Sequence, residues 1–275
     1  MAELRCTILG CGSSGGVPRI GGDWGECDPA NPRNQRRRCA LLVEREEAGG
    51  ITRVLIDTPP DLRGQLLDAG VGHLDAVLYT HSHADHVHGI DDLRVVVYNR
   101  KDRLAVWADG PTQDNLYSRF GYAFVQPEGS PYPPILDMHT IKGHASKGHA
   151  IKDDITITGA GGAITFTPFE VNHGSIDALG FRMEDVAYLP DVAEIPEAAW
   201  PALEGLDCWI VDALRRRPHP THAHLDRTLE WIARAAPRRA VLTNMHVDLD
   251  YETVAAETPA HIAPAHDGLV LRRAL

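Results

Sequence analysis

The sequence predicts a layered α/β fold built from two similar halves. Strand-like apolar segments alternate with helix-like segments, and this order of strands followed by a helix occurs twice along the chain. The chain shows no fixed-period repeat, and no stretch has the composition of a linker between independent domains. We therefore expect residues 1–275 to form a single domain.

The first half of the chain contains four strand-like segments and two helix-like ones. Apolar residues at helical spacing predict a helix over 61–70, which ends at Gly70, a common stop signal. A second helix is expected from Ile90 to about Asn99. The short apolar runs predict strands at 3–11, 39–43, 53–57 and 74–80.

The second half repeats the alternation after a segment of different composition. Residues 110–154 are rich in Pro and Gly, and we expect them to form an arm or lid that leaves the core. Helices are expected near 194–204 and over 225–236. Strands are expected at 155–158, 163–169, 179–183, 186–190, 207–213 and 239–244.

Composition and charge exclude several classes of function. Asp and Glu number 38 against 27 Lys and Arg, a formal charge of −11, which argues against a general nucleic-acid binder. No run approaches the roughly 18 apolar residues of a membrane span, and residues 1–5 have no signal-peptide character. The five cysteines form no Cys-x-x-Cys pair, which indicates reduced thiols and a cytoplasmic protein.

The strongest chemical signal is the segment Thr80-His-Ser-His-Ala-Asp-His86, which directly follows a predicted strand. His81 and His83 alternate, so in extended backbone their side chains point the same way. Asp85 and His86 lie where the chain turns into a helix and can face a second metal. Imidazole and carboxylate together suit zinc, and also iron or manganese. The segment therefore predicts a metal site.

This segment resembles the signature of the metallo-β-lactamase superfamily, and further matching residues follow the family order. They are the strand-end acid Asp57, His173 in PFEVNHG, Asp191 in AYLPD and His246 in VLTNMH. The resemblance covers nearly the whole chain. It implies a four-layer αβ/βα sandwich that holds two divalent metal ions, Zn²⁺ or Mn²⁺, at one edge.

The resemblance also implies a role for each of these residues. His81, His83 and His173 would hold the first metal. The second metal would be held by Asp85, His86 and His246, and Asp191 would bridge the two. Asp57 would orient a ligand imidazole through a hydrogen bond. We count Asp57 and Asp85 with the catalytic residues for these reasons.

A histidine-rich stretch at 213–226 precedes a predicted amphipathic helix. Thr221-His222 resembles the additional motif of the phosphodiesterase branch of the superfamily, which includes tRNA 3′-end endonucleases and cyclic phosphoribosyl phosphodiesterases. We expect His222 to be a general acid or a phosphate contact, with His224 and His219 as neighbouring alternatives. Alternatively, His222 is only a histidine that precedes a helix and has no catalytic role.

The N-terminal segment LGCGSSGGVPRIGGDWGECDP, followed by NPRNQRRRCALLV, resembles the cyclic phosphodiesterase subgroup. A Gly/Ser loop exposes backbone N–H groups that can receive an anion. Arginines 36–38 can neutralise phosphate, and we expect Arg38 to contact the substrate. Alternatively, the glycines only form a tight loop and the arginines only form a solvated face, with no role in substrate binding.

The predicted function is hydrolysis of a small cyclic phosphate or nucleotide-like phosphodiester by a hydroxide that bridges two metals. A carbon-ester hydrolase of the same fold (a lactonase or thioesterase) and a tRNA-processing endonuclease are the alternatives. A non-catalytic relative is disfavoured because all seven ligand positions are filled. The acidic charge argues against long nucleic acid and membrane surfaces as partners, and a homodimer is the commonest assembly for such a chain.

Overall fold

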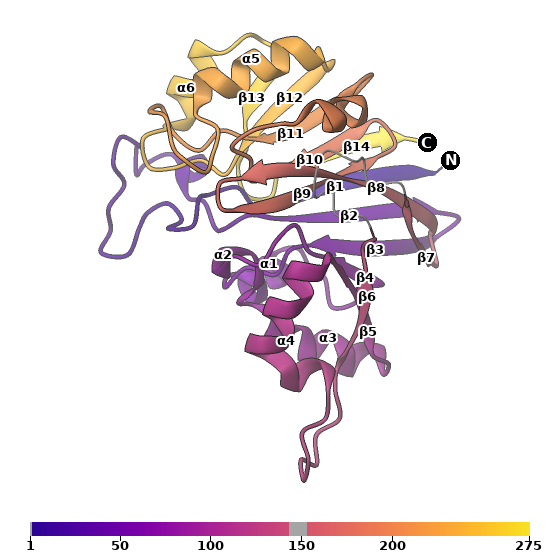
Figure 1. Cartoon of the computed structure of the whole chain (residues 1–275). Coiled ribbons are helices and arrows are strands. Elements are labelled where there is room, and N and C mark those ends of the chain that lie inside the picture. The colour runs from indigo at the N-terminus through magenta and orange to yellow at the C-terminus, as the bar shows by residue number, and fades with distance from the viewer. Residues whose placement is uncertain (1, 143–152) are drawn as a thin grey trace.

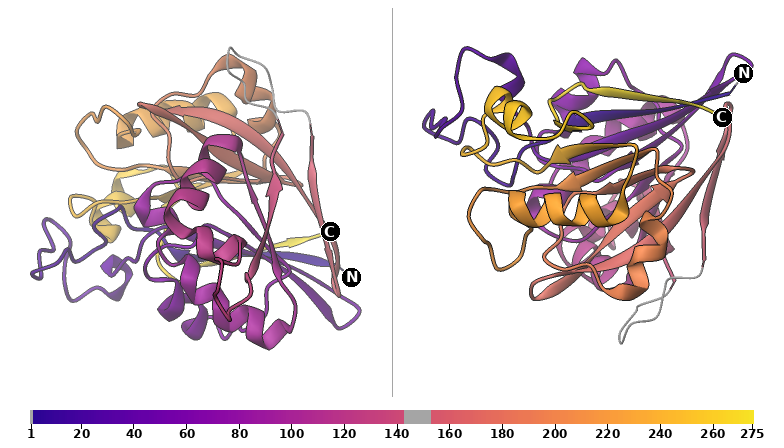
Figure 2. Two further views of the ribbon diagram at one scale, coloured as in Figure 1. Left: turned by 60° about the horizontal axis from the view of Figure 1, so that its bottom comes forward. Right: turned by 90° about the horizontal axis from the view of Figure 1, so that it is seen from above.

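The computed structural model describes residues 2–142 and 153–275. Two seven-stranded sheets pack face to face, and helices cover the outer face of each sheet (Figures 1 and 2). The chain therefore has the four-layer αβ/βα architecture with two similar halves that the sequence predicts. The two termini lie together, because β1 and β14 pair and the Leu275 N–H donates to the Ala2 carbonyl at 3.0 Å.

The first sheet has the order β14-β1-β2-β3-β4-β5-β6. Its strands from β14 to β3 pair antiparallel, and those from β3 to β6 pair parallel. The strands are β1 (Glu3–Gly10), β2 (Ala40–Glu47), β3 (Gly50–Ile56), β4 (Ala76–Leu78), β5 (Leu104–Ala108), β6 (Leu136–Thr140) and β14 (Val270–Ala274).

The second sheet has the order β13-β12-β11-β10-β9-β8-β7. Here β7 to β10 pair antiparallel, and β10 to β13 pair parallel. The strands are β7 (Ile155–Gly159), β8 (Gly162–His173), β9 (Ile176–Met183), β10 (Val186–Leu189), β11 (Cys208–Asp212), β12 (Arg239–Thr243) and β13 (Ile262–Pro264).

Six α-helices and three 3₁₀ helices occupy the outer layers and connections of the described chain. Helices α1 (Leu62–Asp68), α2 (Ala84–Val87), α3 (Leu93–Arg100) and α4 (Gly110–Phe124) belong to the first half. Helices α5 (Leu225–Ala235) and α6 (Tyr251–Glu257) belong to the second. The 3₁₀ helices are η1 (Pro32–Asn34), η2 (Ile90–Asp92) and η3 (Glu197–Leu203). Among the residues described, no helix combines the length and the apolar character needed to cross a membrane.

The strands form because their apolar residues are buried on both faces of each sheet. In β2, Leu41 and Val43 pack into the core between the sheets, whereas Leu42 packs into the core under α1–α4. Such burial on both faces explains the continuous apolar runs in the sequence. Full burial of one such side chain contributes about 1.5–3 kcal/mol to folding.

The segment 110–154, expected to be an arm or lid, is largely part of the core. Helix α4 begins at Asp109, whose carboxylate accepts from the Thr112 N–H at 3.0 Å, and Pro111 lies in its first turn, where proline fits well. Strand β6 then pairs parallel with β5. Only the connection 125–135 projects beyond α4 (Figure 1). Residues 143–152 of the expected excursion lie outside the described residues.

The helix expected near 194–204 is the 3₁₀ helix η3 instead, because Pro201 lies inside it and has no N–H to donate. The short elements β5, α6, β13 and β14 were not predicted from the sequence.

Candidate metal centre

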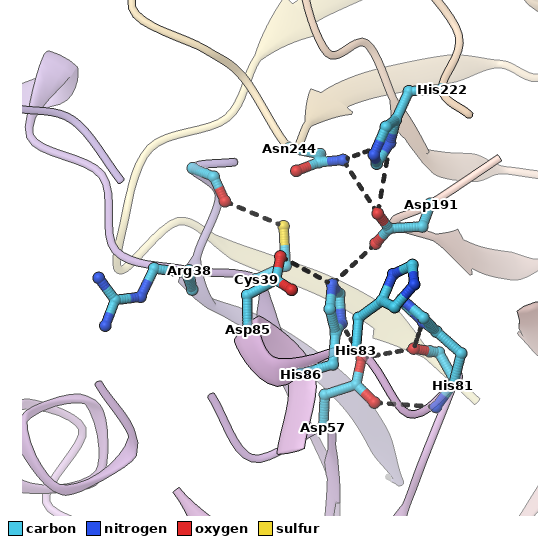
Figure 3. A network of polar contacts seen from close by, with 12 residues as sticks. Arg38, Cys39, Asp57, His81, His83, Asp85, His86, Asp191, His222 and Asn244 are labelled. Atoms are coloured by element: carbon cyan, nitrogen blue, oxygen red, sulfur yellow. Dashed lines mark hydrogen bonds and ion pairs between the residues drawn. The ribbon is translucent and has the colours of Figure 1, made fainter. Parts of the chain in front are cut away.

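The chemically active side chains gather where strands end at one edge of the two sheets (Figure 3). The first sheet supplies one residue after β3 and the residues of the loop and helix α2 that follow β4. The second sheet supplies residues at or directly after the ends of β8, β10, β11 and β12. In chain order these residues are Asp57, His81, His83, Asp85, His86, His173, Asp191, Asp212 and Asn244.

Three histidines form the first donor group. One ring nitrogen from each of His81, His83 and His173 lies within 4.8 Å of the others. His173 is oriented by its Nδ1, which donates to the Thr221 carbonyl at 2.6 Å, so that Nε2 faces His83 Nδ1 at 3.1 Å. Burial lowers the pKa of His173 to about 4 and that of His81 well below its usual value. The rings are therefore neutral, the form that binds a metal.

A second donor group contains His81, His86 and Asp191. Asp57 is fully buried, and its Oδ2 accepts from His86 Nδ1 at 2.7 Å, which directs His86 Nε2 toward Asp191 Oδ2 at 2.9 Å. Asp85 Oδ2 lies 3.6 Å from the same His86 nitrogen. Burial opposes the charge on Asp191, but His86 and the other imidazoles hold its pKa well below the usual range.

These two groups fit a divalent cation. The Nε2 atom of His81 is buried without a hydrogen-bond partner at the point where both groups meet. An unpaired buried ring nitrogen is costly, and a metal ion is the partner that would satisfy it together with the neighbouring imidazoles and carboxylate. His81, His83, His86, His173 and Asp191 are thus brought together as the resemblance implies.

His222 joins the same cluster from the loop before α5. Its Nδ1 lies 3.1 Å from Asp212 Oδ2 and 3.3 Å from Asp191 Oδ1, and it forms a third donor group with His173 and Asp191. Burial lowers the pKa of His222, but the Asp212 carboxylate outweighs it and raises that pKa to about 9. The ring of His219 lies beside it, 5.2 Å between centroids, whereas His224 is the residue that precedes α5.

His246, assigned to the second metal on the family resemblance, lies outside these donor groups. Strand β12 ends at Thr243, and the next residue, Asn244, has a left-handed backbone with φ of 59°. Its amide Nδ2 donates to Asp191 Oδ1 at 3.3 Å and to Asp212 Oδ1 at 3.1 Å. His246 is two residues farther along, and its Nε2 contacts Arg19. Asn244 lies beside Asp191, and the assignment of His246 to the second metal stays a prediction.

Arg38 is also placed differently from the expectation. Its guanidinium Nε lies 2.9 Å from Asp61 Oδ2, an ion pair with the residue that precedes α1. Of the N-terminal arginines, Arg19 of the Gly/Ser-rich loop lines the cavity beside the site, and Arg215 lines it from the second half of the chain. Sequence reasoning missed Arg19, Asp212 and Asn244, although Asp212 and Asn244 lie at strand ends as Asp57 and Asp191 do, which the family resemblance assigned.

A cavity of about 320 Å³ opens beside the cluster. Its walls carry two guanidinium groups, three imidazoles and one carboxylate, so cationic and hydrogen-bonding groups predominate. The lining residues are Ser13, Ser14, Gly15, Arg19, Asp85, Leu214, Arg215, His219, His222, Asn244 and His246. A hydrophilic anion of modest size suits this cavity.

Residues 52–245 match the profile of the β-lactamase superfamily domain, and the chain belongs to this superfamily. A solved diphosphatase of the PhnP family is 35% identical, with a TM-score of 0.86 over 99% of this chain and 98% of that one. Zinc-bound PqqB from Methylobacterium extorquens, 19% identical with a TM-score of 0.69 over 97% of this chain and 99% of that one, shows the same fold. The fold is that of the metallo-β-lactamases, and the chain is an enzyme of this class.

Two curated proteins are also similar in sequence. A protein named octanoyltransferase from Porphyromonas gingivalis is 34% identical over 230 residues, which are 82% of this chain and 43% of that protein. A ribonuclease Z from Bradyrhizobium is 44% identical over 64 residues, 22% of this chain and 20% of that protein. The chain thus matches less than half the length of either curated relative.

Proposed function

We propose that this enzyme is a metal-dependent phosphodiesterase that acts on a small phosphodiester. The observation that carries the proposal is the cationic cavity beside the histidine–aspartate cluster. Arg19 and Arg215 line it together with three histidines. Guanidinium groups pair with phosphate oxygens in a geometry that few other anions match. Both guanidinium groups already contact protein partners, but an uncharged lactone or thioester would gain less than a phosphate from their charge.

The ligand residues divide into two sets. His81, His83 and His173 would hold one ion, and Asp85 and His86 the other, with Asp191 between them. Divalent ions bound by such residues lower the pKa of bound water and polarise a phosphoryl oxygen. Both Zn²⁺ and Mn²⁺ are compatible with imidazole and carboxylate ligands. Asn244 adds a neutral amide beside Asp191, and the family resemblance assigns His246 to the second ion.

His222 is the proposed donor of a proton to the leaving oxygen. Its ring lines the cavity, and its Nδ1 is held by Asp212. Such a carboxylate fixes the orientation of the imidazole and stabilises its protonated form. Asp212 is in turn held in place, because its Oδ2 accepts from the Val192 N–H at 3.1 Å and its Oδ1 from Asn244. The pair is therefore a rigid proton donor at the wall of the cavity.

A small substrate is favoured over a long nucleic acid. The cavity volume of about 320 Å³ is at the lower end of the range for small-molecule sites. The formal charge of −11 disfavours a long polyanion, and the similar diphosphatase supports a phosphorylated substrate. A cyclic phosphate or a nucleotide-like diester fits these limits. The expected homodimer stays a prediction.

The experiment that tests this proposal combines metal analysis with turnover. Metal content of the purified protein is measured, and hydrolysis of bis(p-nitrophenyl) phosphate is followed before and after chelation and after Mn²⁺ or Zn²⁺ is restored. We expect about two ions per chain and turnover that depends on them. His81→Ala should abolish turnover, while His73→Ala, at a half-exposed histidine outside the cluster, should not change it.

The same preparation is tested on a lactone and a thioester. Hydrolysis of the carbon esters without any hydrolysis of the phosphodiester would refute the proposal and favour the alternative chemistry of the same fold.

A further inference from the structure

The basic segment 36–38, expected to neutralise phosphate, buries its first arginine between two loops that line the cavity. These are the Gly/Ser loop, residues 12–17, and the loop after β12, residues 244–249. We infer that Arg36 is a positioning residue, which fixes the two loops to each other and thereby places His246 for the second metal ion. This inference rests on the proposed function, because the ion that the family resemblance assigns to His246 is part of the proposed site.

The backbone of Arg36 holds the Gly/Ser loop. The Val17 N–H donates to the Arg36 carbonyl at 2.9 Å, and the Arg36 N–H donates to the Val17 carbonyl at 2.8 Å. At the other end of the loop, a Cβ atom at Gly12 would lie 2.9 Å from both the Cβ atom and the carbonyl oxygen of Arg36. Glycine is therefore needed for this close approach. Residues 13–15, between these two contacts, line the cavity.

The side chain of Arg36 holds the loop after β12. Its Nη2 donates to the Leu249 carbonyl at 2.7 Å, and its Nη1 donates to the His246 carbonyl at 3.4 Å. The Leu249 N–H also donates to the His246 carbonyl, at 3.1 Å, and closes the turn 246–249. The guanidinium thus joins both ends of this turn, and the position of the His246 backbone depends on it.

Other hydrogen bonds keep the loop after β12 in place without the guanidinium. The Met245 N–H donates to the Cys11 carbonyl at 2.8 Å, and the Glu26 N–H donates to the Val247 carbonyl at 2.8 Å. We therefore expect variants of Arg36 to fold, with the turn 246–249 less well fixed.

The surroundings of the guanidinium indicate a role beyond packing. Arg36 is 2% exposed, and its acceptors are the two carbonyl oxygens, the Asn34 amide oxygen at 3.1 Å and the Cys27 thiol at 3.8 Å, all of them neutral. Its Nε is buried without a hydrogen-bond partner among the described residues. A buried cation with neutral acceptors is costly, and an apolar side chain of similar size often stabilises a core at least as well. An apolar side chain, however, cannot join the two carbonyls.

A purely structural role and a positioning role predict different metal affinities. If Arg36 only stabilises the fold, a variant that remains folded should bind both ions as the wild type does. If Arg36 positions the turn 246–249, the second ion should bind more weakly, while the ion of His81, His83 and His173 should be unaffected. Excess metal should then restore activity, because the ligands themselves are intact.

The test uses the full chain with the variants Arg36→Met and Arg36→Lys. Methionine removes the donors and keeps an unbranched side chain, whereas lysine keeps the charge but donates from a single nitrogen. Arg53→Met is the matched control, because Arg53 of β3 is also an arginine of low exposure, 25%, and pairs with Glu44 outside the cavity.

Three measurements are made on each variant. Urea unfolding shows whether it is folded, and Co²⁺ titration followed by visible absorption gives the affinity for each ion. The kcat and KM for bis(p-nitrophenyl) phosphate are then measured at increasing metal concentration.

We expect Arg36→Met to bind the second ion about 10- to 100-fold more weakly and the first ion as the wild type does. Arg36→Lys should be intermediate, Arg53→Met should match the wild type in both affinities, and excess metal should restore most of kcat in Arg36→Met. Wild-type affinity for both ions in folded Arg36→Met, equal weakening of both ions, or a wild type that binds only one ion would each overturn the inference. If Arg36→Met does not fold, Arg36→Lys decides by the same criteria.

The same data separate this inference from the proposed function. If Arg36→Met weakens the second ion as expected but the wild type hydrolyses no phosphodiester, the proposed function fails and the role of Arg36 stands. If the wild type hydrolyses the phosphodiester and folded Arg36→Met keeps both ions, the proposed function stands and the role of Arg36 fails.

Discussion

Asp57 lies behind the metal cluster, and its replacement tests how the cluster is held. The carboxylate is fully buried and accepts from the Thr80 N–H at 2.8 Å, from the Thr80 hydroxyl at 2.8 Å and from His86 Nδ1 at 2.7 Å. Asp57→Asn replaces one acceptor oxygen by an NH₂ group. Asparagine tolerates the left-handed backbone of this residue, φ 66°, so the substitution tests the hydrogen bonds and not the backbone.

Either orientation of the new amide breaks one interaction. If its oxygen faces His86, the NH₂ group opposes the Thr80 N–H, and two buried donors face each other. If its NH₂ group faces His86, Nδ1 becomes the acceptor and Nε2 carries the proton, so Nε2 cannot bind a metal. We expect the metal-free variant to lose about 1–3 kcal/mol of stability, the cost of one unsatisfied buried donor. Metal affinity should fall about 10- to 100-fold.

Asp57→Ala should destabilise the metal-free protein more than Asp57→Asn does. The Thr80 hydroxyl keeps His81 Nδ1 as a partner at 3.0 Å, but the Thr80 N–H and His86 Nδ1–H are left without an acceptor, at a cost of about 2–6 kcal/mol. Urea unfolding of the metal-free protein and competition with a chelating dye measure the two effects. Asp109→Asn is the control, because this buried residue caps α4 and asparagine is an equally good cap. Wild-type urea stability together with wild-type metal affinity in Asp57→Asn would refute this reasoning.

Two further predictions concern the proton donor and the cap of α6. Asp212→Asn should slow hydrolysis of diphenyl phosphate by about 10²-fold or more, because its poor leaving group needs the proton from His222. Hydrolysis of bis(p-nitrophenyl) phosphate, which has a better leaving group, should slow much less. Equal losses of rate for the two substrates would contradict the assignment of His222 as the proton donor. Burial raises the pKa of Asp250, but hydrogen bonds from the Thr253 and Asp28 N–H groups and from Asn34 outweigh it and lower that pKa to about 2. Its stabilising effect is present above the unfolded pKa of about 3.9 and is lost as pH falls through about 2. Asp250→Ala should cost about 1 kcal/mol at pH 7 and almost nothing at pH 2, measured by urea unfolding at each pH; an equal cost at both would argue against a charged cap.

The residues of the metal cluster were largely predictable from the sequence, because the His-x-His-x-Asp-His segment and the family resemblance assign them in order along the chain. Strand β3 ends just before Asp57, β8 ends at His173, and Asp191 comes two residues after β10. Strand β3 belongs to the first sheet and β8 and β10 to the second, so these residues meet only when the two sheets pack with these strand ends at one edge. The order of these residues along the chain was therefore enough to predict most members of the metal cluster.

The contacts of His246 and Arg38 show the limit of that reasoning. His246 and Asn244 both follow β12, and only the end of the strand and the left-handed backbone of Asn244 decide which side chain turns toward Asp191. Likewise, Arg38 and Arg19 both belong to the N-terminal segment, and Asp61 draws Arg38 away from the cavity. These outcomes depend on partners far apart in sequence.

By itself, the sequence determined the fold class, the sheet-forming segments and the metal-binding chemistry of this protein, because burial and strand periodicity are local properties of the chain. Only the tertiary structure decided that β6 extends the first sheet, that Asn244 lies beside Asp191 and that Arg19 reaches the cavity. The physical reason is that strand pairing and side-chain direction are set by contacts between segments distant in sequence, which no local pattern specifies.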